Sequence, residues 1–222
     1  MKNIGLFGGT FNPVHFGHLR SAAEVRVRFL LDKVCFIPSA IPPHKSPSRI
    51  ANAKDRFEML KIAIKSYPEF YLSNVELNRQ GPSYTIDTVK YFQSDQTEPA
   101  AYYLILGLDA FLEIDTWKSF KELFRVIPFI VMTRPGLNYC EDKDRVAAVS
   151  DFLNTKISDG YLFSKKDSVY THKVYQPVYM LDITPIDISS TNIRTLIKNK
   201  EPVSFFMPED VELFVKNNGL YI

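Results

Sequence analysis

The stretch GLFGGTFNPVHFGH, residues 5–18, brings glycines, a proline and two histidines together near the start of the sequence. An apolar run over residues 2–7 predicts a strand before the glycines, and the amphipathic pattern of residues 17–31 predicts a helix after them. Gly8, Gly9 and Thr10 therefore fall in a turn between a strand and a helix. Such a turn is either a plain connection or a place where the chain binds a ligand.

Alternation of strand and helix patterns continues beyond this turn. Further apolar runs predict strands at residues 34–38, 71–77, 102–106, 129–133 and 178–183. Amphipathic stretches predict helices at residues 52–66, 85–93 and 110–124, the last with a break. This order predicts an α/β fold of the Rossmann-like type, an open parallel sheet with helices on both faces.

The second half of the sequence is less regular. Residues 136–176 contain a charged helical pattern near residues 142–154 and then a polar, tyrosine-rich stretch, which we expect to pack at the edge of the fold. Two more helices are predicted, one up to Lys198 with N-cap candidates at its start and one over residues 209–217. We expect a single domain over residues 1–222, with a helical portion at about 189–222.

Composition narrows the class of protein. The 222 residues are 45% hydrophobic with a formal net charge of +2, and the basic residues are scattered, so no nucleic-acid partner is expected. No apolar stretch reaches the length of a membrane span and no signal peptide is visible, which predicts a cytoplasmic protein with no membrane partner. Cys35 and Cys140 fit no metal-binding pattern and are expected to be reduced thiols.

The glycine turn has the chemistry of an anion site. Glycines let backbone N–H groups approach a ligand closely, and the following helix has a partial positive charge at its N-terminus. His15 and His18 lie one turn apart at that helix start, where imidazoles can donate hydrogen bonds to phosphoryl oxygens as negative charge develops. The pattern is neither GxxxxGK[ST] nor GxGxxG. The alternatives are a turn whose histidines only cap the helix, and a zinc site, for which no third ligand is evident.

A family resemblance supports the phosphate interpretation. GGTFNPVHFGH resembles the (H/T)xGH motif of the nucleotidyltransferase superfamily of adenylyl- and cytidylyltransferases. The superfamily's second motif, ISSTxIR, matches residues 188–194, ISSTNIR. The hydroxyls and amides of this segment stand at another predicted helix start, and Arg194 adds a cation with several donors. Simple capping of that helix is the alternative reading.

Three middle segments narrow the resemblance to the bacterial nicotinate-nucleotide adenylyltransferases, over most of the chain. Residues 42–45 match PPHK, residues 81–88 match GPSYTxDT, and residues 107–117 match GxDA…W. Asn12 departs from the aspartate of some relatives, and residues 136–176 match least well.

The resemblance implies site residues by position. Catalysis is implied for His15, His18 and Arg194. ATP contacts are implied for Gly8, Gly9, Thr10, Phe11, His15, His18, Lys45, Gly107, Asp109, Ser189, Ser190, Thr191 and Arg194. Contacts with the mononucleotide are implied for Thr10, His44, Lys45, Tyr84, Thr85, Trp117 and Arg134. Trp117 would stack on the pyridine ring, with backbone near Thr85 and after Trp117 receiving the nicotinate carboxylate.

The expected reaction is transfer of AMP from ATP to nicotinate mononucleotide, giving nicotinate adenine dinucleotide and pyrophosphate. Mg²⁺ is expected to accompany ATP, held by phosphate oxygens and water and not by protein ligands. A homo-oligomer is possible. The alternatives are nicotinamide mononucleotide or another phosphorylated acceptor, an ATP sensor without catalysis and, less favoured for want of GxGxxG, a dehydrogenase.

Overall fold

The computed structural model describes residues 1–42, 50–94, 99–133 and 142–222. Its described strands form one sheet in the order β3-β2-β1-β4-β5-β8-β7-β6. The strands are β1 (Lys2–Gly9), β2 (Lys33–Pro38), β3 (Phe70–Leu72), β4 (Ala100–Gly107), β5 (Phe129–Thr133), β6 (Leu162–Ser164), β7 (Val169–Thr171) and β8 (Val178–Asp182). The six strands from β3 to β8 in this order pair in parallel, as the sequence predicts.

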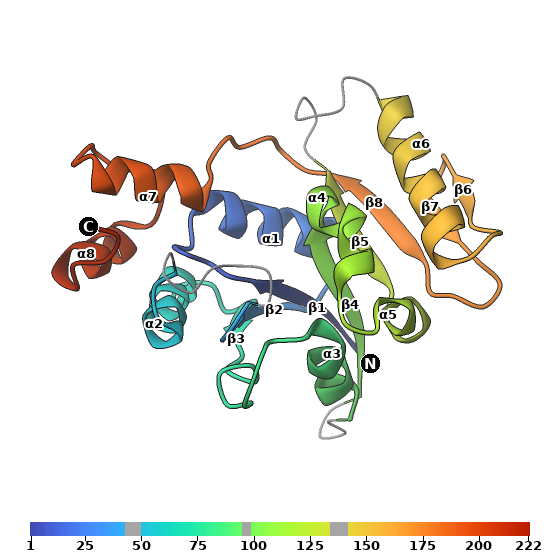
Figure 1. Ribbon diagram of the computed structural model, residues 1–222, viewed down its shortest axis with the longest axis horizontal. Helices are drawn as coiled ribbons and strands as arrows, with labels where there is room; N and C mark the ends of the chain where they lie inside the picture. Colours follow the sequence, from blue (N-terminus) through green and yellow to red (C-terminus); the bar gives the residue numbers. More distant parts are fainter. Residues whose placement is uncertain (43–49, 95–98, 134–141) are drawn as a thin grey trace.

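Helices cover both faces of the sheet (Figure 1). One face packs against α1 (Phe16–Arg28), α2 (Ala53–Ile64) and α8 (Glu209–Asn217), with α7 (Ser190–Lys198) beside α1. The other face packs against α3 (Thr85–Ser94), α4 (Leu108–Leu112), α5 (Phe120–Val126) and α6 (Asp142–Phe152). A 3₁₀ turn, Ile114–Thr116, separates α4 from α5, which is the predicted break, and a π-helical turn, Leu153–Ile157, continues α6. The domain boundaries given above stay a prediction.

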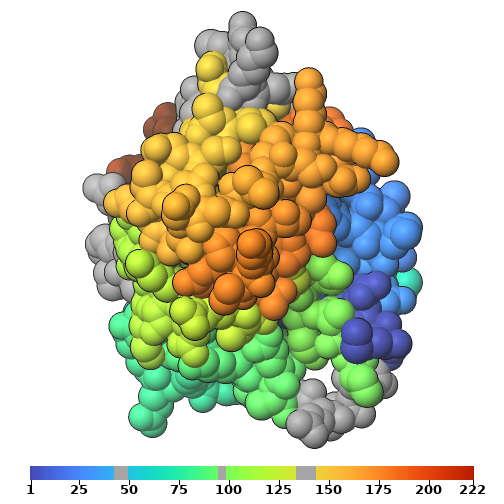
Figure 2. Space-filling model, turned by 90° about the vertical axis from the view of Figure 1, so that its right-hand side faces the viewer, coloured from blue at the N-terminus to red at the C-terminus, as the bar shows by residue number. Residues whose placement is uncertain are grey.

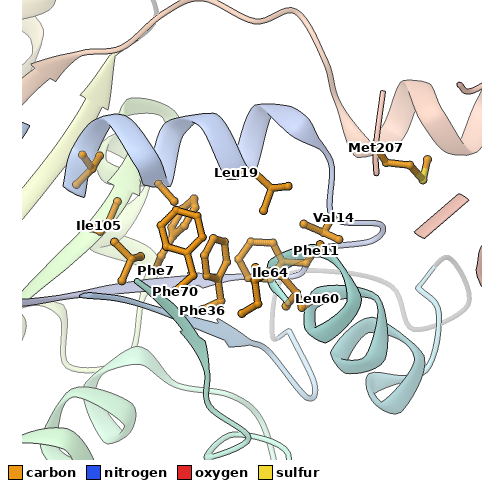
Figure 3. Close-up of a cluster of buried hydrophobic side chains, with 14 of the residues drawn as sticks. Phe7, Phe11, Val14, Leu19, Phe36, Leu60, Ile64, Phe70, Ile105 and Met207 are labelled. Carbon is orange, nitrogen blue, oxygen red and sulfur yellow. The ribbon is translucent and has the colours of Figure 1, made fainter. Parts of the chain in front are cut away.

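Two buried clusters fill the space between sheet and helices. The cluster beneath α1 and α2 is rich in aromatic rings, with Phe7, Phe11 and Phe36 in mutual contact (Figure 3). Its side chains come from strand ends and helix faces that the apolar periodicity predicts. Because Phe11 belongs to this cluster, the turn that follows β1 is anchored directly in the core.

The edge beyond β8 differs from the parallel sheet. β6 and β7 form an antiparallel hairpin, and β7 pairs antiparallel with β8. Figure 2 shows the hairpin and α6 together covering this edge. The prediction that this stretch packs at the edge is confirmed, whereas its strands, each only three residues long, were not predicted.

One predicted strand is too long. The run at residues 71–77 was expected to be extended throughout, but β3 ends at Leu72. The backbone N–H of Asn78 then donates to the carbonyl of Asn74, so the chain turns. Within this turn Glu76 is buried and bonded to the Thr88 hydroxyl, a contact that a continued strand would not allow.

Candidate active site

The candidate site lies at the carboxyl ends of β1 and β4. The chain crosses to β2 on one side of β1 and to β4 on the other, so the strand order reverses there. Open α/β sheets bind ligands at this switch point. A cavity of about 350 Å³ opens here. It is lined by Phe7, Gly8, Gly9, Thr10, Ser39, Pro42, Glu76, Ser83, Tyr84, Thr85, Leu104, Ile105, Leu106, Gly107, Ala110, Thr116, Trp117 and Lys118.

Several residues predicted from the sequence meet in this cavity. The residues predicted to contact the mononucleotide are Thr10, Tyr84, Thr85 and Trp117, and those predicted to contact ATP are Gly8, Gly9 and Gly107. Gly8 and Gly9 were predicted to lie in a turn, but they are the last residues of β1 and pair with Ile37 and Pro38 of β2, so the turn begins only at Thr10. A Cβ at Gly8 would meet nothing within 4 Å, so the backbone at the end of β1 is open to an approaching ligand. At Gly107 a Cβ would lie 2.5 Å from Asp109 Oδ1, so a larger residue there would displace the exposed Asp109 carboxylate.

The start of α3 forms one wall of the cavity. The carbonyl of Tyr84 accepts from the N–H groups of Asp87 and Thr88, so the helix begins directly after Tyr84. The first N–H groups of a helix have no partner within it, and they carry its partial positive charge. A carboxylate placed against Thr85 would therefore be stabilised by the helix start.

Trp117 lines the cavity directly after the 3₁₀ turn. Its backbone N–H donates to the carbonyl of Ile114, which fixes its position at the end of that turn. Its neighbour Lys118 ties this segment to α3. The Lys118 ammonium lies 4.6 Å from the centre of the Tyr84 ring and 3.1 Å from a carboxylate oxygen of Asp87. Aromatic ring, cation and helix start thus converge on one end of the cavity.

Glu76 is a lining residue that sequence reasoning missed. Its carboxylate is buried and accepts from the Thr88 hydroxyl at 2.7 Å. Burial raises its pKa, while the Thr88 and Ser83 side-chain hydrogen bonds and the charges of Arg79 and Arg56 lower it in part. In the sequence Glu76 looks like a surface residue of a predicted strand, so only its burial reveals it.

The two histidines lie against each other at the start of α1. Their ring centres are 3.7 Å apart, and the backbone N–H of His15 donates to His18 Nδ1 at 3.3 Å. Because Nδ1 accepts this bond, the hydrogen of a neutral His18 ring is on Nε2. His15 is 3% exposed and His18 is half-buried. A Cβ at Gly17 would lie 3.0 Å from His15 Nδ1, which explains the glycine between the histidines.

The second motif contacts the first across the whole sequence. The Ser190 hydroxyl donates to the carbonyl of Pro13 at 2.9 Å, and the Arg194 guanidinium donates to the carbonyl of Asn12 at 2.8 Å. The Ser189 side chain caps α7 by accepting from the N–H of Asn192. Arg194 also donates to the Thr191 hydroxyl. The predicted capping of α7 is confirmed, and the structure brings the two motifs into contact.

Two further residues, Ala51 and Tyr221, bond to the Asn12 side chain in the loop of the first motif. The side-chain oxygen of Asn12 accepts from the N–H of Ala51 at 3.0 Å and from the Tyr221 hydroxyl at 2.8 Å. Burial raises the pKa of Tyr221, and the charges of Arg194 and Arg56 act in the opposite direction. Tyr221 did not stand out in the sequence, where it resembles an ordinary residue near the chain end. Arg56, a buried residue of α2, did not stand out either.

The other predicted residues stand as follows. Phe11 is buried, with its ring centre 5.0 Å from that of His18, so its side chain supports the histidine from the core. Asp109 is exposed beside Gly107. His44, Lys45 and Arg134 lie outside the described residues. The roles assigned to all these positions stay predictions.

The described residues can also be considered as possible metal ligands, membrane spans or reactive thiols. In the described ranges no three His, Cys, Asp or Glu side chains gather as a metal-binding group, and none of the helices there is long and apolar enough to cross a membrane. Cys35 is a buried free thiol whose pKa burial raises to about 12, and Cys140 lies outside the described part. His172 is half-buried and its Nδ1 accepts from the N–H groups of Val174 and Tyr175.

Comparison with known proteins agrees with this geometry. The family model described as cytidylyltransferase-like matches residues 6–196. A probable nicotinate-nucleotide adenylyltransferase of Desulfatibacillum aliphaticivorans is 38% identical over 221 residues, 99% of each chain. Another, of Moorella thermoacetica, is 37% identical and covers 98% of this chain and 91% of the relative.

Solved structures share the fold. The nicotinic acid mononucleotide adenylyltransferase of Plasmodium falciparum, complexed with NaAD, superposes with a TM-score of 0.73 at 17% identity, covering 100% of this chain and 98% of the other. A putative nicotinate-nucleotide adenylyltransferase of Vibrio parahaemolyticus gives a TM-score of 0.61 at 16% identity. At this identity the likeness shows a common fold.

Proposed function

The chain belongs to the cytidylyltransferase-like family, and from that premise we propose that it transfers AMP from ATP to nicotinate mononucleotide, releasing pyrophosphate. Full-length relatives with this activity in their names support the proposal. One observation carries it: the Gly8-Gly9-Thr10 segment at the end of β1 adjoins both the cavity and the histidine pair. Gly9 lies against the Phe11 ring, and that ring lies against His18.

The reaction joins two anions, so the site has to bring them together and stabilise their negative charge. The 5′-phosphate of the mononucleotide is already ionised at neutral pH, so its oxygen attacks the α-phosphorus of ATP without a strong general base. A new P–O bond forms as the bond from the α-phosphorus to the oxygen bridging to the β-phosphorus breaks. The oxygen's electron pair leaves with pyrophosphate. Catalysis then consists mainly of positioning and charge stabilisation.

The histidine side supplies the charge stabilisation. His18 would donate from Nε2 to a phosphate oxygen, because its Nδ1 is occupied by the backbone of His15. Arg194 and the start of α7, where Ser189 and Ser190 stand, would hold the leaving pyrophosphate. His44 and Lys45 are proposed to assist from the preceding loop, as the sequence resemblance implies. No covalent intermediate is needed.

Mg²⁺ fits this site as a partner of ATP. The groups named around the histidine pair are imidazole, hydroxyl and guanidinium groups, which can donate hydrogen bonds to phosphate oxygens. The ion would be held by phosphate oxygens and water, and it would neutralise charge on the triphosphate. A cytoplasmic location and a homo-oligomeric state stay predictions.

The cavity favours the acid over the amide as acceptor. A nicotinate carboxylate against the start of α3 would meet helix N–H groups and their partial positive charge, from which a neutral amide gains less. The Lys118 ammonium nearby is paired with the Asp87 carboxylate, so it adds little to this preference. Trp117 would stack on the pyridine ring at this end. Nicotinamide mononucleotide is therefore the second acceptor to test.

The test is pyrophosphate release by the purified protein with Mg-ATP and one acceptor at a time. Nicotinate mononucleotide should support release, and nicotinamide mononucleotide should do so much more slowly. Phosphopantetheine serves as the unrelated phosphorylated acceptor. Equal rates with acid and amide would contradict the account of the cavity, and ATP binding without release from any acceptor would favour a sensor.

A further inference from the structure

Arg56 is a buried arginine that the proposed reaction does not use directly. It stands in the first turn of α2 and is 1% exposed, the largest side chain among the most deeply buried. A buried guanidinium is costly unless its donors are satisfied. Here they are satisfied by backbone carbonyls from three separate segments of the chain.

The three hydrogen bonds join the start of the turn after β1 to two other segments. Nη1 donates to the carbonyl of Thr10 at 2.8 Å, Nη2 to that of Ala40 at 3.1 Å, and Nε to that of Ala51 at 2.9 Å. Thr10 follows β1, Ala40 follows β2, and Ala51 precedes α2. A rigid planar fork can join three such carbonyls, whereas a lysine ammonium cannot copy this geometry.

Further hydrogen bonds join these segments to one another and to Ser83. The N–H of Ser39 donates to the carbonyl of Gly9, and the N–H of Ala40 donates to the Ser83 hydroxyl oxygen. The N–H of Ser83 donates to the carbonyl of Ile41. Since Ser83 lines the cavity and precedes α3, the frame around Arg56 reaches the acceptor end of the site.

We infer that Arg56 is a positioning residue for phosphoryl transfer: it holds the end of β1 and Thr10 after it in register with the cavity wall at Ser83 and with the histidine pair. Because Arg56 is 1% exposed, it would touch neither substrate. This inference rests on the proposed function, because the turn is where the acceptor phosphate would meet ATP. A displacement of about 1 Å in such a turn is enough to lower a rate on the order of 100-fold.

The principal experiment compares Arg56→Lys and Arg56→Ala with wild type in the pyrophosphate assay. We expect kcat per folded molecule to fall about 100-fold in both variants. The KM for nicotinate mononucleotide should change far less, because Trp117 and the start of α3 are left in place. Adding millimolar guanidinium should restore part of the kcat of Arg56→Ala, while ammonium at equal ionic strength should not.

A matched control separates positioning from loss of stability. Leu153→Ala removes a buried side chain from the π-helical turn after α6, in the cluster on the other face of the sheet, and should destabilise the fold without altering the turn. Its kcat per folded molecule should stay at the wild-type value. Equal losses of kcat in the Leu153 and Arg56 variants, or no effect of guanidinium, would overturn the inference.

A second measurement does not depend on activity. Amide hydrogen exchange at Ser39, Ala40 and Ala51 should be faster in Arg56→Lys than in wild type, and exchange in β4 and β5 should be unchanged. Unchanged exchange at these three amides would refute the role of Arg56. If wild type itself releases no pyrophosphate, the proposed function fails, and the exchange comparison still decides whether Arg56 holds the turn.

Discussion

The acceptor cavity and the histidine side of the site are assembled over different distances along the chain. In the cavity wall, Glu76 bonds to Thr88 and Lys118 pairs with Asp87, separations of 12 and 31 residues. On the histidine side, the loop at Asn12 and Pro13 is bonded to residues 177 to 209 positions away. The cavity is lined by residues of the first 118 positions of the chain and its wall is held by bonds between nearby elements, whereas the histidine side also needs bonds from the last part of the chain.

This difference predicts different consequences for catalysis and for binding. The cavity provides an aromatic ring and a helix start, which bind the acceptor equally in ground state and transition state. The histidine side provides donors for charge that develops during transfer. Changes in the cavity should therefore act mainly on KM, and changes beside the histidines mainly on kcat.

The largest effect is expected for His18→Ala. Removing a donor that acts on transition-state charge should lower kcat roughly 100-fold or more, with a small change in the KM of either substrate. Steady-state kinetics with both substrates varied would measure this. A normal kcat would mean that the stacked histidine pair only caps α1.

Trp117→Ala should act in the opposite way. Loss of stacking on the pyridine ring should raise the KM for nicotinate mononucleotide roughly 10-fold or more while leaving the KM for ATP nearly unchanged. The same assay with each substrate varied separately tests this. Equal increases for both substrates would show that Trp117 only packs in the fold.

Gly17→Ala tests the packing of the histidines. The new methyl group would lie 3.0 Å from His15 Nδ1, so the ring must move by a few tenths of an ångström. We expect kcat to fall several-fold, on the order of 10-fold. The melting temperature should change little, because alanine also gains about 1 kcal/mol of helix propensity over glycine. A lowered melting temperature with unchanged kcat would contradict this account.

The smallest effect is expected for Glu76→Gln, and it concerns stability. The pKa of Glu76 is raised in the fold above its ordinary value of 4.5, so the wild type loses stability as pH rises from that value through the folded pKa. The glutamine variant lacks this loss. Its free energy of unfolding relative to wild type should therefore increase between pH 4 and pH 8, as urea denaturation would measure. A difference that does not change with pH would show that Glu76 is not desolvated.

Local sequence patterns predicted the elements that determine where the site lies. The strand at β1, the helix starts at Thr85 and Ser190, and the broken helix before Trp117 follow from periodicity and capping, which need only neighbouring residues. Two antiparallel strands were missed because three residues cannot display an alternating pattern.

Arg56 and Glu76 show what local patterns cannot predict. Each is a charged residue whose partners come from other parts of the fold, and charged residues are usually exposed. Their burial depends on carbonyls and hydroxyls that only the folded chain brings within reach. The resemblance found the residues proposed to touch substrate, whereas these supporting residues became visible only in the structure.

The loop at Asn12 and Pro13 is bonded to Ser190, Arg194 and Tyr221, and this affects when the loop can form during synthesis of the chain. A ribosome makes the histidine motif near the beginning of translation, yet the residues that hold its loop emerge more than 170 residues later. Throughout elongation the carbonyls of Asn12 and Pro13 therefore lack the donors that they have in the fold. We expect this loop to reach its final geometry only when the last helices have been made.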